Sequence, residues 1–382
     1  MDTHASIRGG LRMKKSEYDL KELCLEITNV CPLNCIHCSG KCNLKSSLAL
    51  SIDKIKQIIN DFAFLGGKTL EISGGEPLLH PALPQIINYA SKRRLETILY
   101  TSGNVLSSHR KPMPVCSNLA LKLRRAGLSK VIFSLQGATA STHEAVTQVK
   151  GSFDNVLHSI GVIKKYGFWI GVHFVPMKVN FKEFAAVCAL SNRLQVNEIG
   201  VLRFVPQGRG RDNIQDLSLT KTEFAEFSSL LKKLVDTWGP KRIRIGRPVD
   251  FRFIMDPYKT KTECDAGKSR CLISPDGKVK PCPAFKNCED KYVAGNIKDE
   301  SLVNIWNETS KWVDLRQFDY KLVGEPCSSC DSLQKCKGGC LAQKLLKYDD
   351  LYAGPDPCCF KAIIPVTAIH PSGARIQKQV RG

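Results

Sequence analysis

The hydrophobic and polar positions of the chain fall into short alternating runs, each followed by a longer run with the spacing of an amphipathic helix. Residues 22–28 alternate as a half-buried strand does, and Ser51 then begins an apolar stripe of helical period that reaches about Phe64. The predicted helices with the clearest stripes are residues 51–64, 153–166 and 220–238, and the predicted strands are residues 22–28, 69–73, 96–101, 130–135, 168–174 and 198–204.

Strands that alternate with helices favour a parallel sheet with right-handed crossovers, in which the loops after the carboxyl ends of the strands line the ligand site. The chain supplies six such strand-and-helix units. Six units are too few to close an eight-stranded barrel. We therefore predict an α/β fold, a partial (β/α)6 barrel with an open lateral mouth.

The composition of the chain changes at Cys264, where helical periodicity fades and cysteines become dense. The run Ser274-Pro275-Asp276-Gly277 predicts a hairpin turn between two short strands. The expected organisation is a disordered N-terminus over residues 1–19, a barrel over 20–250, a second domain over 251–360 built from a β-hairpin plus helices, and a basic C-terminal tail over 361–382.

The 382 residues include 17 cysteines, which form tight clusters instead of the scattered spacing of a secreted disulfide scaffold. This pattern indicates metal binding in a reducing compartment. No signal peptide is visible, and no apolar run approaches the roughly 18 to 20 residues of a membrane span. We therefore predict a cytoplasmic protein without membrane contact. The formal charge of +20 would attract nucleic acid, anionic membrane or acidic peptide alike, and a generally basic solvated surface explains it equally well.

The loop after the first predicted strand holds three cysteines within eight residues, Cys31, Cys35 and Cys38. A cubane iron–sulfur cluster held only by three protein thiolates keeps its fourth iron open to bind and activate another molecule. A partial zinc site or ordinary reduced thiols are the alternatives, although structural zinc prefers four protein ligands.

A second motif follows the second predicted strand and consists of Gly74, Gly75, Glu76 and Pro77. Two glycines let a backbone approach a ligand closely, and a carboxylate at a strand end can pair with an ammonium group. With both motifs in this order, the chain from about residue 20 to Cys359 resembles a radical S-adenosylmethionine (SAM) enzyme with a C-terminal SPASM domain.

The resemblance implies roles for single residues. The open iron would be chelated by the amino and carboxylate groups of the methionine moiety of SAM, and Gly74 to Pro77 would receive its ammonium. His37 stands where the family usually has an aromatic residue near the adenine. Contacts with the ribose or methionine are implied for Ser102, Asn104, Ser134 and Gln136, and a contact with the methionine carboxylate for Arg203. The alternative for the four polar residues is a role in turns or in strand-end capping, and the alternative for Arg203 is a side chain directed to the surface.

The resemblance also divides the cysteines of the second domain into two sets, each ligating one auxiliary four-iron cluster. One set is Cys264, Cys271, Cys282 and Cys340, and the other is Cys327, Cys330, Cys336 and Cys358. Cys359 competes with Cys358 for the last place. Two four-thiolate zinc sites are the alternative. The thiols that remain, expected to be structural or free, are Cys24, Cys42, Cys116, Cys188 and Cys288.

The expected activity follows from the resemblance. One electron delivered to the first of three [4Fe–4S] clusters, from a flavodoxin or a ferredoxin, would cleave SAM and yield a 5′-deoxyadenosyl radical that abstracts hydrogen from a substrate. We expect a precursor peptide, modified by a crosslink, an epimerisation or a backbone excision. Only about twenty residues precede the first strand, so we expect a separate small leader-peptide-binding protein, and we expect no nucleic-acid partner.

Other functions fit the same residues. A sulfatase-type formylglycine maturase would carry an acidic residue directly after the third cysteine of the first auxiliary set, where this chain has Pro283. Radical oxidation or decarboxylation of a small molecule or tetrapyrrole is a further reading. An iron–sulfur electron carrier without catalysis would explain the cysteines but not the Gly74–Pro77 motif.

Overall fold

The computed structural model describes residues 17–246, 264–288 and 290–359. Most of the N-terminal segment predicted to be disordered lies outside these ranges. The same is true of the predicted domain boundary at residue 250 and of the basic tail over 361–382.

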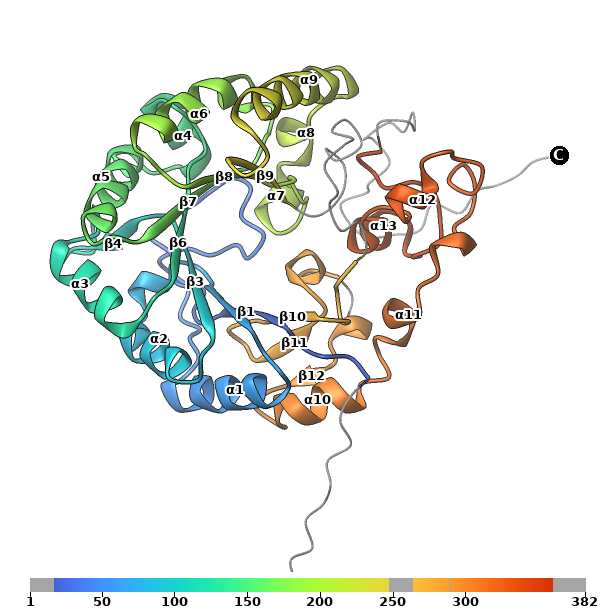
Figure 1. Ribbon diagram of the computed structural model, residues 1–382, viewed down its shortest axis with the longest axis horizontal. Coiled ribbons are helices and arrows are strands. Elements are labelled where there is room, and N and C mark those ends of the chain that lie inside the picture. The colour runs from blue at the N-terminus through green and yellow to red at the C-terminus, as the bar shows by residue number, and fades with distance from the viewer. Residues whose placement is uncertain (1–16, 247–263, 289, 360–382) are drawn as a thin grey trace, which may run out of the picture.

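Ten strands form one sheet, which curves into an open arc with the helices of the barrel on its outside (Figure 1). Eight of them run parallel in the order β10, β1, β2, β3, β6, β7, β8, β9, and β11 and β12 continue the β10 edge in antiparallel pairing. The strands of this sheet are β1 (Glu22–Glu26), β2 (Thr69–Ser73), β3 (Glu96–Thr101), β6 (Lys130–Ser134), β7 (Trp169–Phe174), β8 (Glu198–Val201), β9 (Ile243–Ile245), β10 (Arg270–Ile273), β11 (Lys278–Lys280) and β12 (Gly295–Asn296). A separate hairpin is formed by β4 (Asn104–Leu106) and β5 (Pro112–Pro114).

Helices follow the strands and cover the outer face of the arc (Figure 1). The α1 helix begins where the Ser51 hydroxyl accepts a hydrogen bond from the Lys54 N–H, and α9 begins with a capping box of Thr220 and Glu223. The helices are α1 (Ile52–Phe64), α2 (Leu83–Ser91), α3 (Ser117–Ala126), α4 (Ala140–Thr147), α5 (Ser152–Lys165), α6 (Phe184–Arg193), α7 (Arg209–Asp212), α8 (Ile214–Leu217), α9 (Lys221–Trp238), α10 (Leu302–Glu308), α11 (Val313–Arg316), α12 (Leu333–Cys336) and α13 (Leu341–Tyr348).

The two faces of the sheet differ in chemistry because successive side chains of a strand point to opposite sides. In β2, Leu70 and Ile72 are fully buried in the apolar core under the helices. Glu71 lies between them on the concave face, where its carboxylate accepts hydrogen bonds from Tyr100 of β3 and Arg270 of β10. This part of the concave face is therefore polar and charged.

All six predicted strands are present, and the predicted partial barrel is confirmed. The structure adds one parallel strand that the hydrophobic pattern did not reveal, β9 beside β8. The predicted turn over residues 274–277 does join an antiparallel hairpin, β10 to β11. Its first strand pairs with β1, so the cysteine-rich region continues the barrel sheet.

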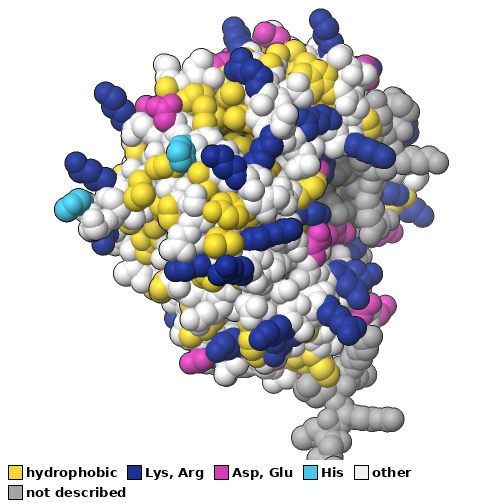
Figure 2. Space-filling model, turned by 60° about the vertical axis from the view of Figure 1, so that its left-hand side comes forward, with side chains coloured by type: hydrophobic (Ala, Val, Ile, Leu, Met, Phe, Trp, Pro, Cys, Tyr) yellow, Lys and Arg dark blue, Asp and Glu magenta, His cyan; other side chains and the backbone are white. Residues whose placement is uncertain are grey.

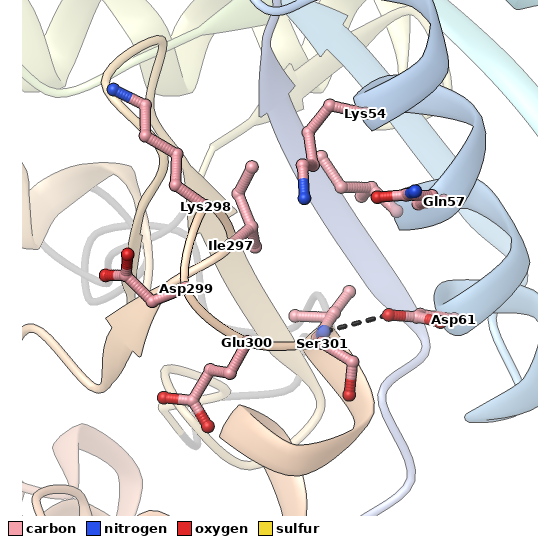
Figure 3. Close-up of a pocket in the computed structure, with 10 residues that line it drawn as sticks. Lys54, Gln57, Asp61, Ile297, Lys298, Asp299, Glu300 and Ser301 are labelled. Atoms are coloured by element: carbon pink, nitrogen blue, oxygen red, sulfur yellow. Dashed lines mark hydrogen bonds between the residues drawn. The ribbon is translucent and has the colours of Figure 1, made fainter.

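The cysteine-rich region also packs against the outside of the barrel, where α10 lies beside α1. The Leu302 N–H donates to Asp61 Oδ2 at 2.8 Å, and the Trp306 indole donates to the Tyr18 carbonyl at 2.6 Å. A pocket opens next to this contact, with Lys54 on one side and Lys298 on the other (Figure 3). None of the predicted site residues lines this pocket.

The surface shown in Figure 2 carries many lysine and arginine side chains and few acidic ones, spread over the face without a single stripe. This distribution agrees with a generally basic surface and does not single out one partner. Among the helices of the described ranges, none has the length and apolar content needed to cross a membrane.

Candidate active site

The three cysteines of the first motif lie on the loop that joins β1 to α1, here called the cysteine loop (residues 27–51). Backbone hydrogen bonds fix this loop to the end of α4, since the Asn34 N–H donates to the Thr147 carbonyl at 3.1 Å and the Ile36 N–H to the Val146 carbonyl at 3.0 Å. Its position at the carboxyl end of a parallel strand is the one expected for a ligand site.

A second clamp comes from α7, which the sequence analysis did not identify. The Arg209 N–H donates to the Cys38 carbonyl at 2.9 Å, and its guanidinium donates to the carbonyls of Cys35 and Cys42 at 2.7 and 2.9 Å. Gly208 makes this approach possible, because a Cβ atom there would lie 2.4 Å from the Ser39 carbonyl oxygen. The only sequence signal for the clamp is the run Gly208-Arg209-Gly210 after the sixth predicted strand.

Burial raises the pKa of the Cys31 thiol and raises that of Cys35 to about 12. A hydrogen bond with Cys42 lowers the pKa of Cys38 and raises that of Cys42. Within the described ranges no three His, Cys, Asp or Glu side chains converge on the position of a single metal ion. A cluster distributes its thiolate ligands over separate irons, and three half-buried cysteines on one fixed loop supply a donor set that fits such a cluster.

His37 lies between two of these cysteines. Burial, followed by the nearby Arg209 charge, lowers the pKa of His37 to about 4, so its ring is neutral at pH 7. The Nδ1 atom is buried, and no hydrogen-bond partner for it is present in the described part of the chain. A flat, neutral ring beside the cluster ligands fits the predicted place near an adenine, which stays a prediction.

The Gly74–Pro77 motif packs directly on the cysteine loop. The Gly75 N–H donates to the Thr28 carbonyl at 2.6 Å and the Glu76 N–H to the Val30 carbonyl at 2.8 Å. A Cβ atom at Gly74 would lie 2.3 Å from the Thr28 oxygen, and one at Gly75 would lie 2.2 Å from the Val30 oxygen. The two glycines therefore allow the two motif loops to touch, a reason for them that the sequence analysis did not foresee.

Glu76 is fully buried, and the end of β3 supplies most of its hydrogen bonds. Oε1 accepts from Thr101 Oγ1 at 2.6 Å and from the Leu78 N–H at 3.1 Å, while Oε2 accepts from the Ser102 N–H at 2.8 Å and its hydroxyl at 2.6 Å. Burial raises the pKa of Glu76 despite these donors. A carboxylate has about four acceptor positions, and all four are used here.

The other predicted SAM contacts lie at the ends of β3 and β6. Asn104 is fully buried and accepts a hydrogen bond from Asn155 at 2.9 Å, and Ser102 contacts Glu76. Gln136 is buried, and its Oε1 accepts from the Val175 N–H at 3.1 Å. The Ser134 side chain is exposed. Ser102, Asn104 and Gln136 thus hold the strand ends together, and direct contact with SAM stays a prediction for all four residues.

Arg203, which follows β8, forms a buried bidentate ion pair with Asp356 of the cysteine-rich region. The same carboxylate accepts from the Cys340 N–H at 2.7 Å and the Cys358 N–H at 2.9 Å. The structure therefore places Arg203 at the backbone of two predicted cluster ligands. Its predicted contact with the methionine carboxylate stays a prediction.

The structure brings together three cysteines of the first auxiliary set, Cys264, Cys282 and Cys340. Burial raises the pKa of Cys282 to about 12, and the neighbouring Cys264 raises it further. Burial raises the pKa of Cys340, and Cys264 and Cys282 raise it further. The thiol of Cys271 lies on β10 in the apolar core, and its charged neighbours are Arg270 and Arg316.

In the second auxiliary set, Cys327 and Cys336 share a neighbour. Burial raises the pKa of both thiols, and Cys359 raises both further, while Cys330 also acts on Cys327. Cys359, the competitor for the last place in the set, is therefore close to two of its members. The four-thiolate donor sets of both groups suit an iron–sulfur cluster and, as chemistry alone, also zinc.

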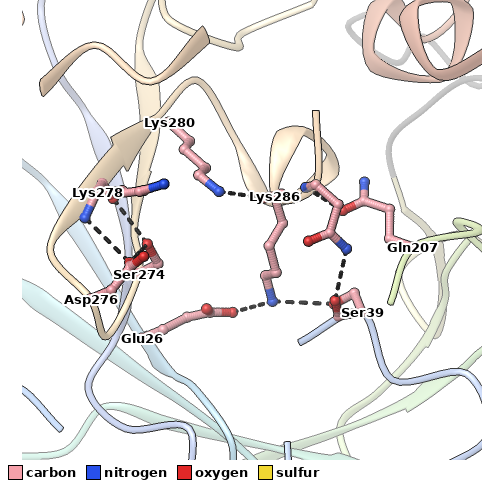
Figure 4. Close-up of polar contacts among 9 residues, drawn as sticks. Glu26, Ser39, Gln207, Ser274, Asp276, Lys278, Lys280 and Lys286 are labelled. Carbon is pink, nitrogen blue, oxygen red and sulfur yellow. Dashed lines mark hydrogen bonds and ion pairs between the residues drawn. The ribbon is translucent and has the colours of Figure 1, made fainter. Parts of the chain in front are cut away.

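The segment after Cys282 reaches back to the cysteine loop (Figure 4). Lys286 Nζ donates to the Glu26 carboxylate and to Ser39 Oγ at 3.2 Å, and Asn287 Nδ2 donates to the Ser39 carbonyl at 3.0 Å. Burial disfavours the charged amine, but Glu26 outweighs it and holds the pKa of Lys286 above its usual range. An ion pair thus joins the cysteine-rich region to Glu26 at the end of β1, and hydrogen bonds join it to Ser39, the residue that follows the last cysteine of the first motif.

Comparisons with known proteins agree with this geometry. The model of the radical SAM superfamily matches residues 25–190, and that of SPASM, an iron–sulfur cluster-binding domain, matches residues 264–331. The chain belongs to the radical SAM superfamily. It is a radical SAM enzyme with a C-terminal SPASM domain, so SAM and iron–sulfur clusters are its cofactors.

Two relatives match over most of this radical SAM protein. The AdoMet-dependent heme synthase of Methanosarcina barkeri is 29% identical, with 87% of this chain and 94% of the relative covered. The mycofactocin maturase MftC of Mycolicibacterium smegmatis is 28% identical, with 88% and 82% covered. The structure of Streptococcus suis SuiB bound to S-adenosylmethionine superposes with a TM-score of 0.71 at 15% identity, covering 89% of this chain and 77% of SuiB, which confirms the fold.

Proposed function

We propose that this radical SAM protein modifies a ribosomally made peptide. The observation that carries the proposal is the direct contact between the cysteine loop and the Gly74–Pro77 motif, which fixes a cluster-ligand loop and a buried carboxylate side by side at the carboxyl ends of β1 and β2. When bound, a cluster with an open iron and SAM supply the reductive cleavage that yields a hydrogen-abstracting radical.

In this proposal the side chains of the protein bind the cluster and SAM, orient them and shield them from solvent. Cys31, Cys35 and Cys38 hold the cluster, and Arg209 fixes the loop that carries them. Glu76 receives the methionine ammonium of SAM. Because its four acceptor positions are already used, the Ser102 hydroxyl must turn away to admit the new donor. This exchange leaves the carboxylate fully hydrogen-bonded in both states.

We propose three four-iron clusters, the first on the cysteine loop and two in the SPASM domain. The second auxiliary set takes Cys358 as its last ligand, and the electrostatic contacts of Cys359 with Cys327 and Cys336 keep Cys359 as its competitor. Anaerobically reconstituted protein should hold about 12 iron atoms per chain. Replacing Cys31, Cys35 and Cys38 together by alanine should remove about four of them and abolish cleavage of SAM. Zinc in place of the remaining iron would contradict the assignment.

The peptide substrate is supported by an open arc of strands whose concave face is polar in part, by a basic surface and by the maturase among the relatives. We assign presentation of the peptide to a separate leader-peptide-binding protein, and delivery of the electron to a flavodoxin or ferredoxin.

A tetrapyrrole is the second candidate substrate, because the heme synthase relative is matched over 94% of its own length. Formylglycine formation is disfavoured. The position directly after Cys282 is Pro283, which begins a short 3-10 helix, and the charged side chain that reaches the cysteine loop from this segment is Lys286, not an acid.

The test is to express the enzyme anaerobically with each short open reading frame encoded beside its gene and to examine the peptides by mass spectrometry. The expected result is a defined mass change at one residue or pair, together with release of 5′-deoxyadenosine, that requires Cys31, Cys35 and Cys38. A carboxylated tetrapyrrole is offered in parallel. Loss of carbon dioxide from it, with every peptide unchanged, would replace the peptide proposal by the second candidate.

A further inference from the structure

Lys344 is a fully buried lysine of α13, the helix that begins directly after Cys340. Its Nζ atom has no hydrogen-bond partner in the described part of the chain. Lysine is rarely buried unless it is paired, because removing an ammonium group from water disfavours its charged form strongly. The position therefore needs an explanation that the protein atoms alone do not give.

Lys344 lies among acidic side chains. Burial lowers the pKa of its amine, and the groups that oppose this effect are Cys327, Asp356, Asp350 and Cys336. Two of these four are cysteines of the second auxiliary set. Its amine also lies close to the backbone of the loop between Cys336 and Cys340, since a Cβ atom built at Gly338 would be 3.8 Å from Nζ.

Asp356 does not satisfy the lysine. Its carboxylate accepts two hydrogen bonds from Arg203, one from the Cys340 N–H and one from the Cys358 N–H. These four donors use the acceptor positions that a carboxylate offers. A second buried donor of the same helix, Gln343 Nε2, also has no partner within the described ranges. Helix α13 thus directs unpaired donors into the protein interior.

We propose that the Lys344 ammonium is the charge partner of the iron–sulfur cluster held by Cys327, Cys330, Cys336 and the Cys358–Cys359 pair. The inference rests on the auxiliary cluster of the proposed function. Four thiolates give such a cluster a net negative charge, which supplies the missing anion. Hydrogen bonds to the sulfurs and nearby charge are among the factors that set the reduction potential of a cluster. Lys344 therefore stabilises the reduced state of this cluster relative to the oxidised one.

The proposal predicts different effects of Lys344 in the apoprotein and in the cluster-bound protein. Without a cluster, Lys344 is a buried charge without a partner, and its replacement by the apolar, similarly long methionine should raise the thermal stability of the apoprotein. With the cluster bound, Lys344→Met should lower its reduction midpoint. If Lys344 had only a structural role, its replacement would not be expected both to stabilise the apoprotein and to make the bound cluster harder to reduce.

The experiment isolates the second auxiliary cluster in a background in which Cys31, Cys35, Cys38, Cys264 and Cys282 are alanine. Iron and sulfide are measured first, and the midpoint is then obtained by redox titration followed by electron paramagnetic resonance. Lys344→Met should shift the midpoint to lower potential, while Lys344→Arg, which keeps the charge, should stay near the value of the background protein. Lys321→Met, at an exposed lysine of the same domain, is the matched control and should change neither midpoint nor apoprotein stability.

The outcomes distinguish the inference from the function on which it rests. A four-iron cluster whose midpoint is the same with lysine and methionine at position 344 would overturn the role of Lys344 and leave the cluster assignment intact. Zinc, or no metal, on the Cys327 set would overturn both. If Lys344→Met prevents cluster insertion, Lys344→Gln is titrated instead, and an unchanged midpoint in that variant would also overturn the proposal.

Discussion

Arg203 and Asp356 form a bidentate ion pair across 153 residues of sequence, with both side chains 3% exposed. Arg203 follows strand β8 of the barrel, and Asp356 lies among the last cysteines of the SPASM domain. Because the same carboxylate accepts the N–H groups of Cys340 and Cys358, one ion pair fixes the end of a barrel strand relative to two predicted ligand positions.

Replacing Asp356 by asparagine should destabilise the protein by about 3 to 5 kcal/mol, since it leaves the Arg203 charge buried and uncompensated. The measurement is chemical denaturation of the apoprotein at pH 7. Asp236→Asn is the control, because Asp236 pairs with Lys232 on the surface of α9, where both side chains are about half exposed. That change should alter the unfolding free energy by less than about 1 kcal/mol. Equal effects of the two substitutions would contradict the importance of burial here.

The same carboxyl group predicts a dependence of stability on pH. Burial opposes its ionisation, but Arg203 and the N–H donors outweigh burial and hold the pKa of Asp356 below its usual value of about 3.9. Its contribution is therefore complete above about pH 4 and is lost as the pH falls through the lowered folded-state pKa. The difference in unfolding free energy between wild type and Asp356→Asn should narrow below pH 4. A difference that stays constant from pH 7 to pH 3 would show that the ion pair does not hold the pKa down.

Glu76→Gln tests the SAM-binding role of the second motif. Loss of a charge-assisted contact normally worth about 1.5 to 3 kcal/mol should weaken SAM binding roughly ten- to a hundredfold, with the iron content unchanged. Equilibrium binding of SAM to the reconstituted enzyme gives the affinity. Ser102→Ala, which removes one donor to Glu76 and keeps its charge, should weaken binding less. Wild-type affinity in the glutamine variant would mean that Glu76 serves the fold alone.

Gly75→Ala tests whether the two motif loops must touch. An added Cβ atom would overlap the Val30 carbonyl, so we expect a loss of stability of about 1 to 3 kcal/mol and weaker SAM binding, because the cysteine loop must move. Gly161 of α5 has nothing within 4 Å of an added Cβ, and Gly161→Ala should stabilise the protein by roughly 0.5 to 1 kcal/mol. The two alanine substitutions should therefore act in opposite directions in thermal unfolding.

The alternation of hydrophobic and polar residues predicted the strands whose bounds depend on residues close in the sequence. Strands β2 and β3 have the bounds expected from alternation, while β1 ends at Glu26, earlier than expected, because Thr28 instead bridges to Ala49. Strand β9 is only three residues long and offers too short a run to recognise. The hairpin strand β10 was expected, but its partner β1 lies far away in sequence, and no hydrophobic pattern states which edge a strand will join.

In the candidate site, too, features carried by local sequence were predicted and contacts between distant segments were not. The motif cysteines and Gly74 to Pro77 were identified from their spacing, because ligand type and spacing carry the chemistry. The supporting contacts were missed, since Arg209 and Lys286 reach the cysteine loop from distant segments and look like ordinary basic residues in the sequence. The Lys286–Glu26 and Arg203–Asp356 pairs are visible only when the chain is folded.

The pairing of β1 with β10 sets an order of events during synthesis. About 250 residues separate the two strands, and at about 5 to 20 residues per second the β1 edge emerges from the ribosome tens of seconds before its partner. An unpaired strand edge is a place where chains associate wrongly. The barrel sheet therefore stays unpaired at its β1 edge until β10, in the domain that carries the auxiliary cysteines, has been synthesised. A chaperone that covers the β1 edge during this interval would protect the protein from wrong association.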